Sequence, residues 1–161
     1  SKAIKQLKNH SETNNHIHTD VDCYISTLIP QDYVEDIFLR LEIYNDISNA
    51  KNDYDIDHIV SKLEDVYGPI PDYLKNLFSL TRVKIEGNRI KADKIKINKE
   101  NTVITLNPKS LIDNDKLINH FVLKNKIKLT DQYNLKYQNI SKDNFCELCE
   151  EVISMMKDIS D

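Results

Sequence analysis

The two cysteines of the segment Cys146-Glu-Leu-Cys149 have the spacing of a redox or metal site. Zinc needs four ligands, usually from two such pairs or from one pair and histidines; beyond this pair the chain has Cys23 and five histidines. A thioredoxin-like pair would begin a helix directly after a strand. Here the pair falls inside an expected helix, with Cys149 on its apolar side. We therefore expect buried structural cysteines, with a redox or metal enzyme as the alternative.

Two acidic clusters could serve calcium binding or acid–base catalysis. Asp53, Asp55 and Asp57 resemble the start of a calcium loop, but His58 stands where such a loop needs its glycine. The glutamate pair at 150–151 lacks the apolar surroundings that raise the pKa of a catalytic carboxyl group. The chain contains no G-x-S-x-G segment, which would mark a serine nucleophile. The sequence therefore predicts no catalytic residue, no metal site and no enzyme activity within this chain.

Glycine is scarce, which excludes a class of nucleotide sites. Gly68 and Gly87 are the only two glycines in 161 residues, where average usage near ~7% would give roughly eleven. A dinucleotide-binding fingerprint needs three glycines, and a Walker A loop needs two together with a Gly-Lys pair. The chain has no Gly-Lys pair. We therefore expect no cofactor-binding residue here.

Charge is unevenly distributed along the chain. Residues 12–65 contain 13 acidic and 3 basic residues, and residues 82–99 contain 7 basic and 2 acidic ones. Such a chain could present an acidic face to one partner and a basic face to another, although a solvated lysine-rich surface would give the same counts. The basic segment 82–99 keeps an accessory DNA-binding domain open as an alternative function. The residues for such contacts would be Arg82, Lys84, Lys94 and Lys96.

The chain divides into a short N-terminal extension and one domain. Residues 1–19 are expected to form the end of a linking helix and a flexible polar connector, and residues 20–161 to form the domain. The β-branched and aromatic residues of 21–29 predict a strand that stops at Pro30. No apolar run approaches the ~20 residues that a membrane helix needs, so we expect no membrane partner.

Three helices should follow this strand. The first is predicted over 32–50, because Asp32 and Glu35 form a D-x-x-E start. Its apolar stripe would consist of Val34, Ile37, Phe38 and Leu41. Periodicity predicts the second helix over 55–67, ending at Gly68, and the third over 72–91, with two apolar stripes that suggest a central position between layers.

The remainder predicts a small β-rich part and a closing helix. Residues 92–106 alternate with a period of two around Lys99-Glu100-Asn101, which is typical of a hairpin. A short helix over 113–124, two short strands and a last helix over 141–157 complete the chain. The order is a strand, three helices, and then an antiparallel β-rich part closed by a C-terminal helix. This order predicts an α+β fold.

Three segments make the chain recognisable as a family member. LIPQDYV at 28–34, RLEIY at 40–44 and LEDVYGPIP at 63–71 resemble the C-terminal domain of bacterial transcription-repair coupling factors. The family pattern there is a strand ending in lP-x-D-Y-I, an R-L-x-x-Y helix and an E-L-x-D-R-F-G-x-x-P helix end. The resemblance covers about 20–157 and is specific up to residue 91.

The resemblance implies a regulatory role inside a larger bacterial, cytoplasmic protein. The parent would be a DNA translocase that uses ATP and magnesium in motor domains, displaces stalled RNA polymerase, binds double-stranded DNA and recruits UvrA. This domain would dock on the N-terminal UvrB-like module of the same protein and mask its UvrA-binding surface, restraining the motor. Such masking relies on effective concentration.

The resemblance also implies an interface on the helix predicted over 55–67. In the family, acidic residues of the E-L-x-D-R-F-G helix meet arginines of the UvrB-like module. Asp65 matches the aspartate of this motif, whereas Lys62 stands at its glutamate and Val66 at its arginine. Exposed ion pairs contribute only about 0–1 kcal/mol each, so an interface can survive such changes. The candidate interface residues are Asp65, Lys62, Glu64 and Ser61.

Overall fold

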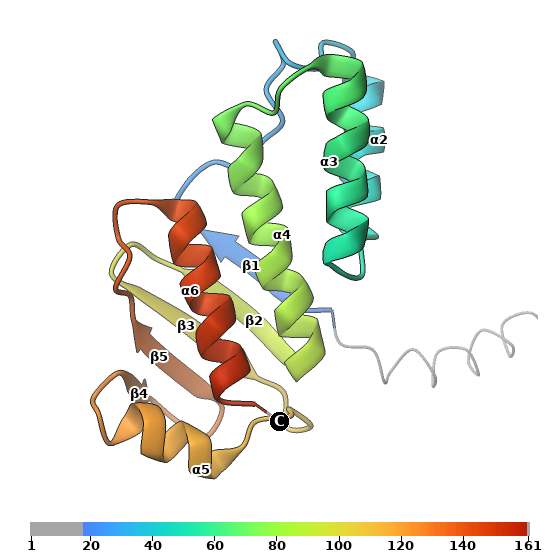
Figure 1. The fold of residues 1–161 in the computed structure, drawn as a ribbon. Helices are drawn as coiled ribbons and strands as arrows, with labels where there is room; N and C mark the ends of the chain where they lie inside the picture. Colours follow the sequence, from blue (N-terminus) through green and yellow to red (C-terminus); the bar gives the residue numbers. More distant parts are fainter. Residues whose placement is uncertain (1–17, 161) are drawn as a thin grey trace, which may run out of the picture.

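The computed structural model describes residues 18–160 of the chain, so the extension predicted over 1–19 lies almost wholly outside the described residues. The fold is α+β, as the order of patterns predicts (Figure 1). The elements are β1 (Asp20–Cys23), α2 (Ile37–Ser48), α3 (Asp53–Tyr67), α4 (Asp72–Ile90), β2 (Ala92–Ile97), β3 (Asn101–Leu106), α5 (Asn114–Leu117), the π-helical turn η1 (Ile118–Val122), β4 (Ile127–Leu129), β5 (Asn134–Gln138) and α6 (Phe145–Asp158).

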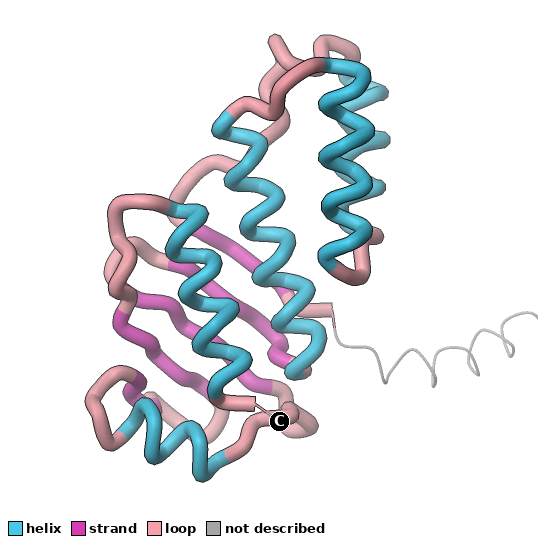
Figure 2. Tube along the Cα trace, viewed as in Figure 1, coloured by secondary structure: helices cyan, strands magenta, loops and turns pink. Residues whose placement is uncertain are grey.

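One five-stranded sheet of order β1-β2-β3-β5-β4 organises the C-terminal part. The predicted hairpin forms as β2 and β3, and every neighbouring pair is antiparallel except β1 with β2. The sheet is therefore mixed, because the first strand joins the β-rich part as a parallel edge. Helices α4 and α6 lie side by side against one face of it (Figures 1 and 2).

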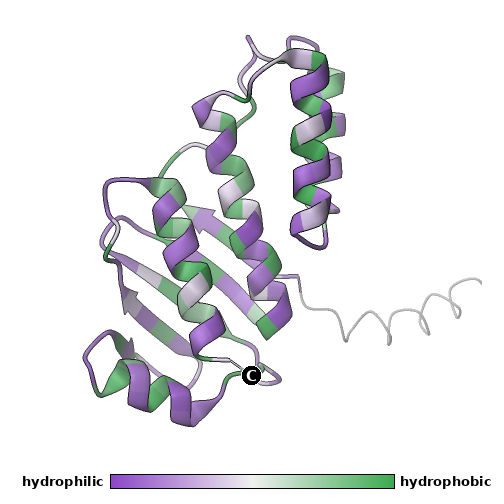
Figure 3. Cartoon of the chain, viewed as in Figure 1, coloured by the Kyte–Doolittle hydropathy of each residue, from purple (hydrophilic) through white to green (hydrophobic). Residues whose placement is uncertain are grey.

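Alternating side chains explain why only one face of the sheet carries helices. Ile95 and Ile97 of β2 and Ile104 of β3 are buried under the helices, while the residues between them are exposed or half-buried. The alternation of hydrophobic and hydrophilic residues is visible along the strands in Figure 3. The face away from the helices is consequently polar.

Helix α4 joins two separate hydrophobic clusters, which confirms its predicted central position. Leu74 and Phe78 pack with α2 and α3 in the first cluster. Val83 and Ile90 pack with the sheet and α6 in the second. Gly87 lies on this second side, where an added Cβ would stand 2.9 Å from side-chain atoms of Thr19 and Ile95. The low glycine count thus includes one residue required by close packing.

Two predicted boundaries near the N-terminus are wrong. The strand expected over 21–29 ends at Cys23, and the helix expected from Asp32 begins only at Ile37. The carbonyl oxygen of Pro30 accepts hydrogen bonds from the backbone N–H groups of Tyr33 and Val34, so these residues form a turn. Asp36 caps the helix instead, accepting from the N–H of Phe38 at 2.8 Å.

The C-terminal elements agree closely with their predictions. The short helix expected over 113–124 is α5 continued by η1, and the last helix begins at Phe145 instead of 141 because Asn144 provides its cap. Within the described residues, no helix is long and apolar enough to cross a membrane.

Candidate protein-interaction surface

The outer side of α3 carries the candidate interface residues. Helical periodicity buries Ile56 and Leu63 against α2 and α4, so the residues between them face solvent. Tyr54 begins this exposed side and stacks on His58, with ring centroids 6.4 Å apart. The structure brings all four candidates to the solvent-facing part of this single helix: Ser61, Lys62, Glu64 and Asp65.

A groove of about 390 Å³ runs between α2 and α3. The candidate residue Lys62 forms part of its wall together with Val66, and Leu39 of α2 lies on the opposite side. Glu42 and Asp46 line the same groove. The arrangement combines apolar walls with two carboxylates from α2, and it can accept a partner that has apolar side chains next to basic groups.

Three of the four residues in the apolar stripe predicted for the first helix are exposed. The residues of α2 that face the hydrophobic core are instead Ile43 and Ile47. Phe38 is 76% exposed and Leu41 is 56% exposed. Since the helix begins five residues later than predicted, the residue Val34 of that stripe is buried in the preceding turn and not on the helix. Helix α2 therefore displays apolar residues to solvent beside the groove.

Polar contacts fix the position of α3 relative to α4. The guanidinium of Arg82 on α4 reaches Asp53 at 3.0 Å and Asp57 at 2.7 Å, both on α3. At the other end of α3, the Tyr33 hydroxyl donates to the carbonyl oxygen of Gly68 at 2.8 Å. The acidic triplet, considered above for calcium, thus provides carboxylates that bind an arginine.

The residues considered for DNA contact do not form one surface. Arg82 is engaged by the two carboxylates of α3. Lys84 lines a cleft beside α4 that Arg82 also lines, on another part of the molecule than the two lysines of β2. Lys94 and Lys96 lie on β2 and face away from the helices. The sequence segment 82–99 is split because α4 and β2 run on different layers of the fold.

The two cysteines of the Cys146–Cys149 pair pack within the fold. Cys149 is buried in the cluster between the sheet and α6, and burial raises the pKa of its thiol. The Sγ of Cys146 lies 3.6 Å from Oδ1 of Asn76 on α4. Among residues 18–160, no group of three His, Cys, Asp or Glu side chains could hold a metal ion. A raised thiol pKa disfavours the thiolate that redox and metal chemistry need.

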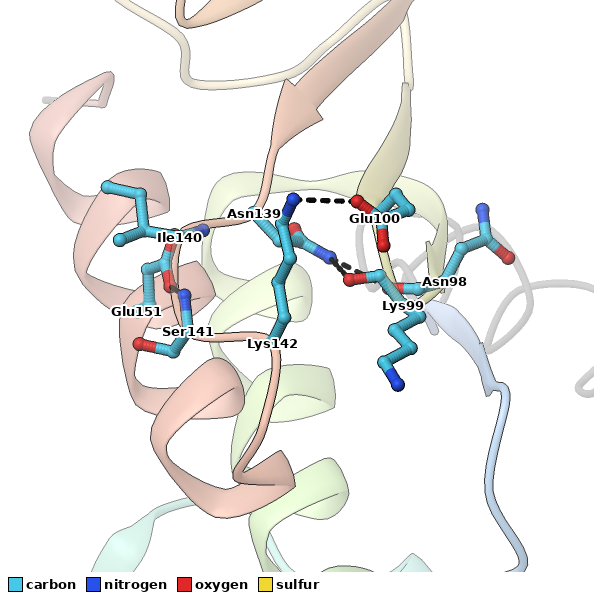
Figure 4. A network of polar contacts seen from close by, with 8 residues as sticks. All are labelled: Asn98, Lys99, Glu100, Asn139, Ile140, Ser141, Lys142 and Glu151. Atoms are coloured by element: carbon cyan, nitrogen blue, oxygen red, sulfur yellow. Dashed lines mark hydrogen bonds and ion pairs between the residues drawn. The ribbon is translucent and has the colours of Figure 1, made fainter.

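Two polar residues hold the sheet to α6, a role that the sequence patterns do not indicate for either of them (Figure 4). The amide of Asn139 donates to the carbonyl oxygens of Asn98 and Lys99 in the hairpin turn. Glu151 accepts from the N–H groups of Ile140 and Ser141. Both residues act on backbone atoms distant in sequence, so no local spacing could have indicated them. Their role is to close the loop after β5.

Comparisons with known proteins agree with this architecture. The family model described as the TRCF domain matches residues 23–117. A transcription-repair-coupling factor of Buchnera aphidicola subsp. Acyrthosiphon pisum is 27% identical over 141 residues, covering 87% of this chain and 17% of the relative. That of Myxococcus xanthus is 32% identical over 101 residues, covering 63% of this chain and 8% of the relative.

A solved structure gives a similar result for the fold. The crystal structure of a C-terminal domain of transcription-repair coupling factor superposes with a TM-score of 0.72 at 17% identity, covering 89% of this chain and 96% of that chain. The chain spans less than a fifth of the length of the two curated relatives. The similarity therefore concerns one domain of a much longer kind of protein.

Proposed function

The chain belongs to the TRCF domain family, and from this premise we propose that it is a non-catalytic, autoinhibitory protein-interaction domain of a transcription-repair coupling factor. Its parent, in this proposal, is a bacterial cytoplasmic DNA translocase whose motor uses ATP and magnesium outside this chain. The parent binds double-stranded DNA, displaces stalled RNA polymerase and recruits UvrA. The domain docks on the UvrB-like module of the same protein and masks its UvrA-binding surface.

The observation that carries the proposal is the exposed surface of α2 and α3. It combines apolar side chains, such as Phe38 and Val66, with the carboxylates of Glu42, Asp46 and Asp65. Apolar groups at the centre of an interface and charges around it are what transient protein contacts use. A partner of complementary character presents arginines or lysines around an apolar patch.

Docking within one protein requires only modest affinity. A flexible linker gives two tethered domains an effective concentration on the order of 1 mM. A Kd of about 10 μM would then keep about 99% of the molecules docked. The low density of ion pairs expected after the changes at Lys62 and Val66 is compatible with such an affinity. A conformational change that separates the two domains releases the masked surface.

The test is calorimetric titration of the 161-residue chain with the separately produced UvrB-like module of the same coupling factor. We expect a Kd on the order of 1–100 μM and competition with UvrA for that module. Asp65→Lys should weaken binding about tenfold, because it reverses a charge facing the basic partner. Asp158→Lys is the matched control, since Asp158 is exposed on α6, and it should leave the Kd unchanged.

Two results would contradict the proposal. Simultaneous binding of UvrA and the chain to the module would exclude masking. Equal Kd values for the chain and the Asp65→Lys variant would remove α3 from the interface. Circular dichroism melting of both variants would separate these results from unfolding, since neither exposed side chain contributes to the core.

A further inference from the structure

The sheet face opposite the helices carries aligned lysines. Lys96 on β2 and Lys136 on β5 both stand opposite Val103 of the intervening β3, on its two sides. Lys128 on β4 pairs directly with Lys136. Lys94 lies two residues before Lys96 and therefore on the same face. These lysines come from two parts of the sequence, 94–96 and 128–136, that only the strand register brings together.

The lysine pair of β4 and β5 is electrostatically unfavourable by itself. Like charges directly opposite each other destabilise a strand pair, as with Lys128 and Lys136. None of the lysines on this face has an ion pair within the described part of the chain. On the same face, Asp20 and Asp22 of β1 are the strand partners of Lys94 and Lys96, but among the described residues neither carboxylate forms an ion pair with these lysines. A polyanion lying across β2, β3, β5 and β4 would neutralise the four lysines together.

The size and flatness of the face restrict what can bind. Adjacent strands are about 4.8 Å apart, so the lysine row from β2 to β4 spans about 14 Å. Within the described residues no helix covers this face, and its neutral positions include Thr105 and Asn134. Among the described elements, no helix lies on this face that could enter a groove and read bases. The face can therefore contact several phosphates without sequence selectivity.

We propose that this lysine face binds the phosphate backbone of double-stranded DNA. A protein partner is disfavoured, because the centre of a protein interface needs apolar or aromatic anchors. The apolar residue in the row of lysines on this face is Val103, which is half-buried. Lysine binds phosphate as a point charge, without the planar geometry that arginine requires. The face is distinct from the α2–α3 surface, so the inference does not rest on the docking proposal.

Fluorescence anisotropy with a labelled 30-base-pair duplex and the 161-residue chain tests the proposal. Four neutralised phosphates give a slope of about −3.6 in log K against log salt concentration, or a roughly 150-fold loss of affinity between 50 and 200 mM salt. Replacing Lys94, Lys96, Lys128 and Lys136 by Gln should weaken binding about 100-fold at 50 mM salt and bring the slope near zero.

A charge-matched control separates this site from general attraction. Replacing four lysines outside the face by Gln changes the net charge equally and should leave affinity within about twofold. An equal loss in this control, or no detectable binding by the original chain, would overturn the proposal. Tighter binding to a polyglutamate peptide than to DNA would assign the face to an acidic protein instead. Melting curves of all variants exclude unfolding. The control lysines are Lys51, Lys75, Lys109 and Lys157.

Discussion

Glu151 is a single residue on which the closing loop depends. Its carboxylate accepts hydrogen bonds from the Tyr137 hydroxyl and from the N–H groups of Ile140 and Ser141. Burial acts to raise the pKa of Glu151, but these hydrogen bonds together outweigh it and the pKa is lowered. Burial and the same hydrogen bond raise the pKa of Tyr137. The pair is therefore stable as a carboxylate and a neutral phenol.

Removing the charge of Glu151 should destabilise the fold in a pH-dependent way. Hydrogen bonds to a charged group contribute about 1.5–3 kcal/mol, and partial solvent access reduces this, so Glu151→Gln should cost about 1–2 kcal/mol at pH 7 by urea denaturation. A carboxyl group with a lowered pKa stabilises above its unfolded pKa and loses this contribution as the pH falls through its folded pKa.

The difference between the original chain and Glu151→Gln should accordingly shrink below about pH 4. Glu150→Gln provides the control, because the neighbouring Glu150 is exposed, and it should change stability by less than about 0.5 kcal/mol. A constant difference from pH 7 to pH 3 would show that the charge is not responsible.

At the scale of elements, α4 packs against two sets of neighbours at once. Its first half packs with α2 and α3, and its second half packs against β2, where Gly87 permits the approach of Thr19 and Ile95. The Thr19 hydroxyl donates to the carbonyl oxygen of Ala92 at 2.7 Å, so this side chain cannot move away without losing a hydrogen bond. The contact therefore constrains the start of β1 against the helix.

Gly87→Ala should destabilise the protein although alanine favours helices. The helical gain of about 1 kcal/mol is opposed by overpacking that costs about 1–3 kcal/mol, so we expect a net loss of about 1 kcal/mol in chemical denaturation. In a Thr19→Ser background, which removes Cγ2 and keeps the hydroxyl group, the cost should be smaller. Stabilisation by Gly87→Ala would mean that α4 can shift away from the sheet.

Local patterns predict the elements whose signals lie within the chain segment itself. Helix α3 and its Gly68 end, helix α4 and the β2–β3 hairpin all follow from periodicity and turn residues. The predicted start of α2 is wrong because Asp32 and Asp36 are equally good capping residues. The turn in which the N–H groups of Tyr33 and Val34 donate to the carbonyl oxygen of Pro30 decides between them. That turn depends on how 30–34 packs, which no local pattern contains.

The candidate surfaces were predictable to different degrees. The exposure of Ser61, Lys62, Glu64 and Asp65 follows from the buried stripe of α3. The exposure of Phe38 does not, since an apolar stripe that faces solvent has the same spacing as one that faces the core. The lysine face depends on the pairing of β3 with β5, which joins segments about thirty residues apart.

At the scale of the whole molecule, two hydrophobic clusters share one helix. The sheet cluster includes α6 and the C-terminal half of α4, and the helical cluster holds α2 and α3 against its N-terminal half. The smaller helical cluster carries the proposed docking surface, and the sheet carries the proposed DNA face. Regions with fewer buried contacts open at lower free energy. The docking surface should therefore be the more dynamic of the two.

Arg82 should control this dynamic difference, because its guanidinium joins α4 to Asp53 and Asp57 of α3. Such partly exposed pairs contribute about 1 kcal/mol together, so Arg82→Gln should speed amide hydrogen exchange in α2 and α3 about fivefold. Exchange in β2 and β3 should be unchanged. Lys142→Gln, which breaks the pair with Glu100 at the hairpin end, should leave α2 and α3 unaffected. Equal acceleration throughout the fold by Arg82→Gln would show instead that the two clusters open as one cooperative unit.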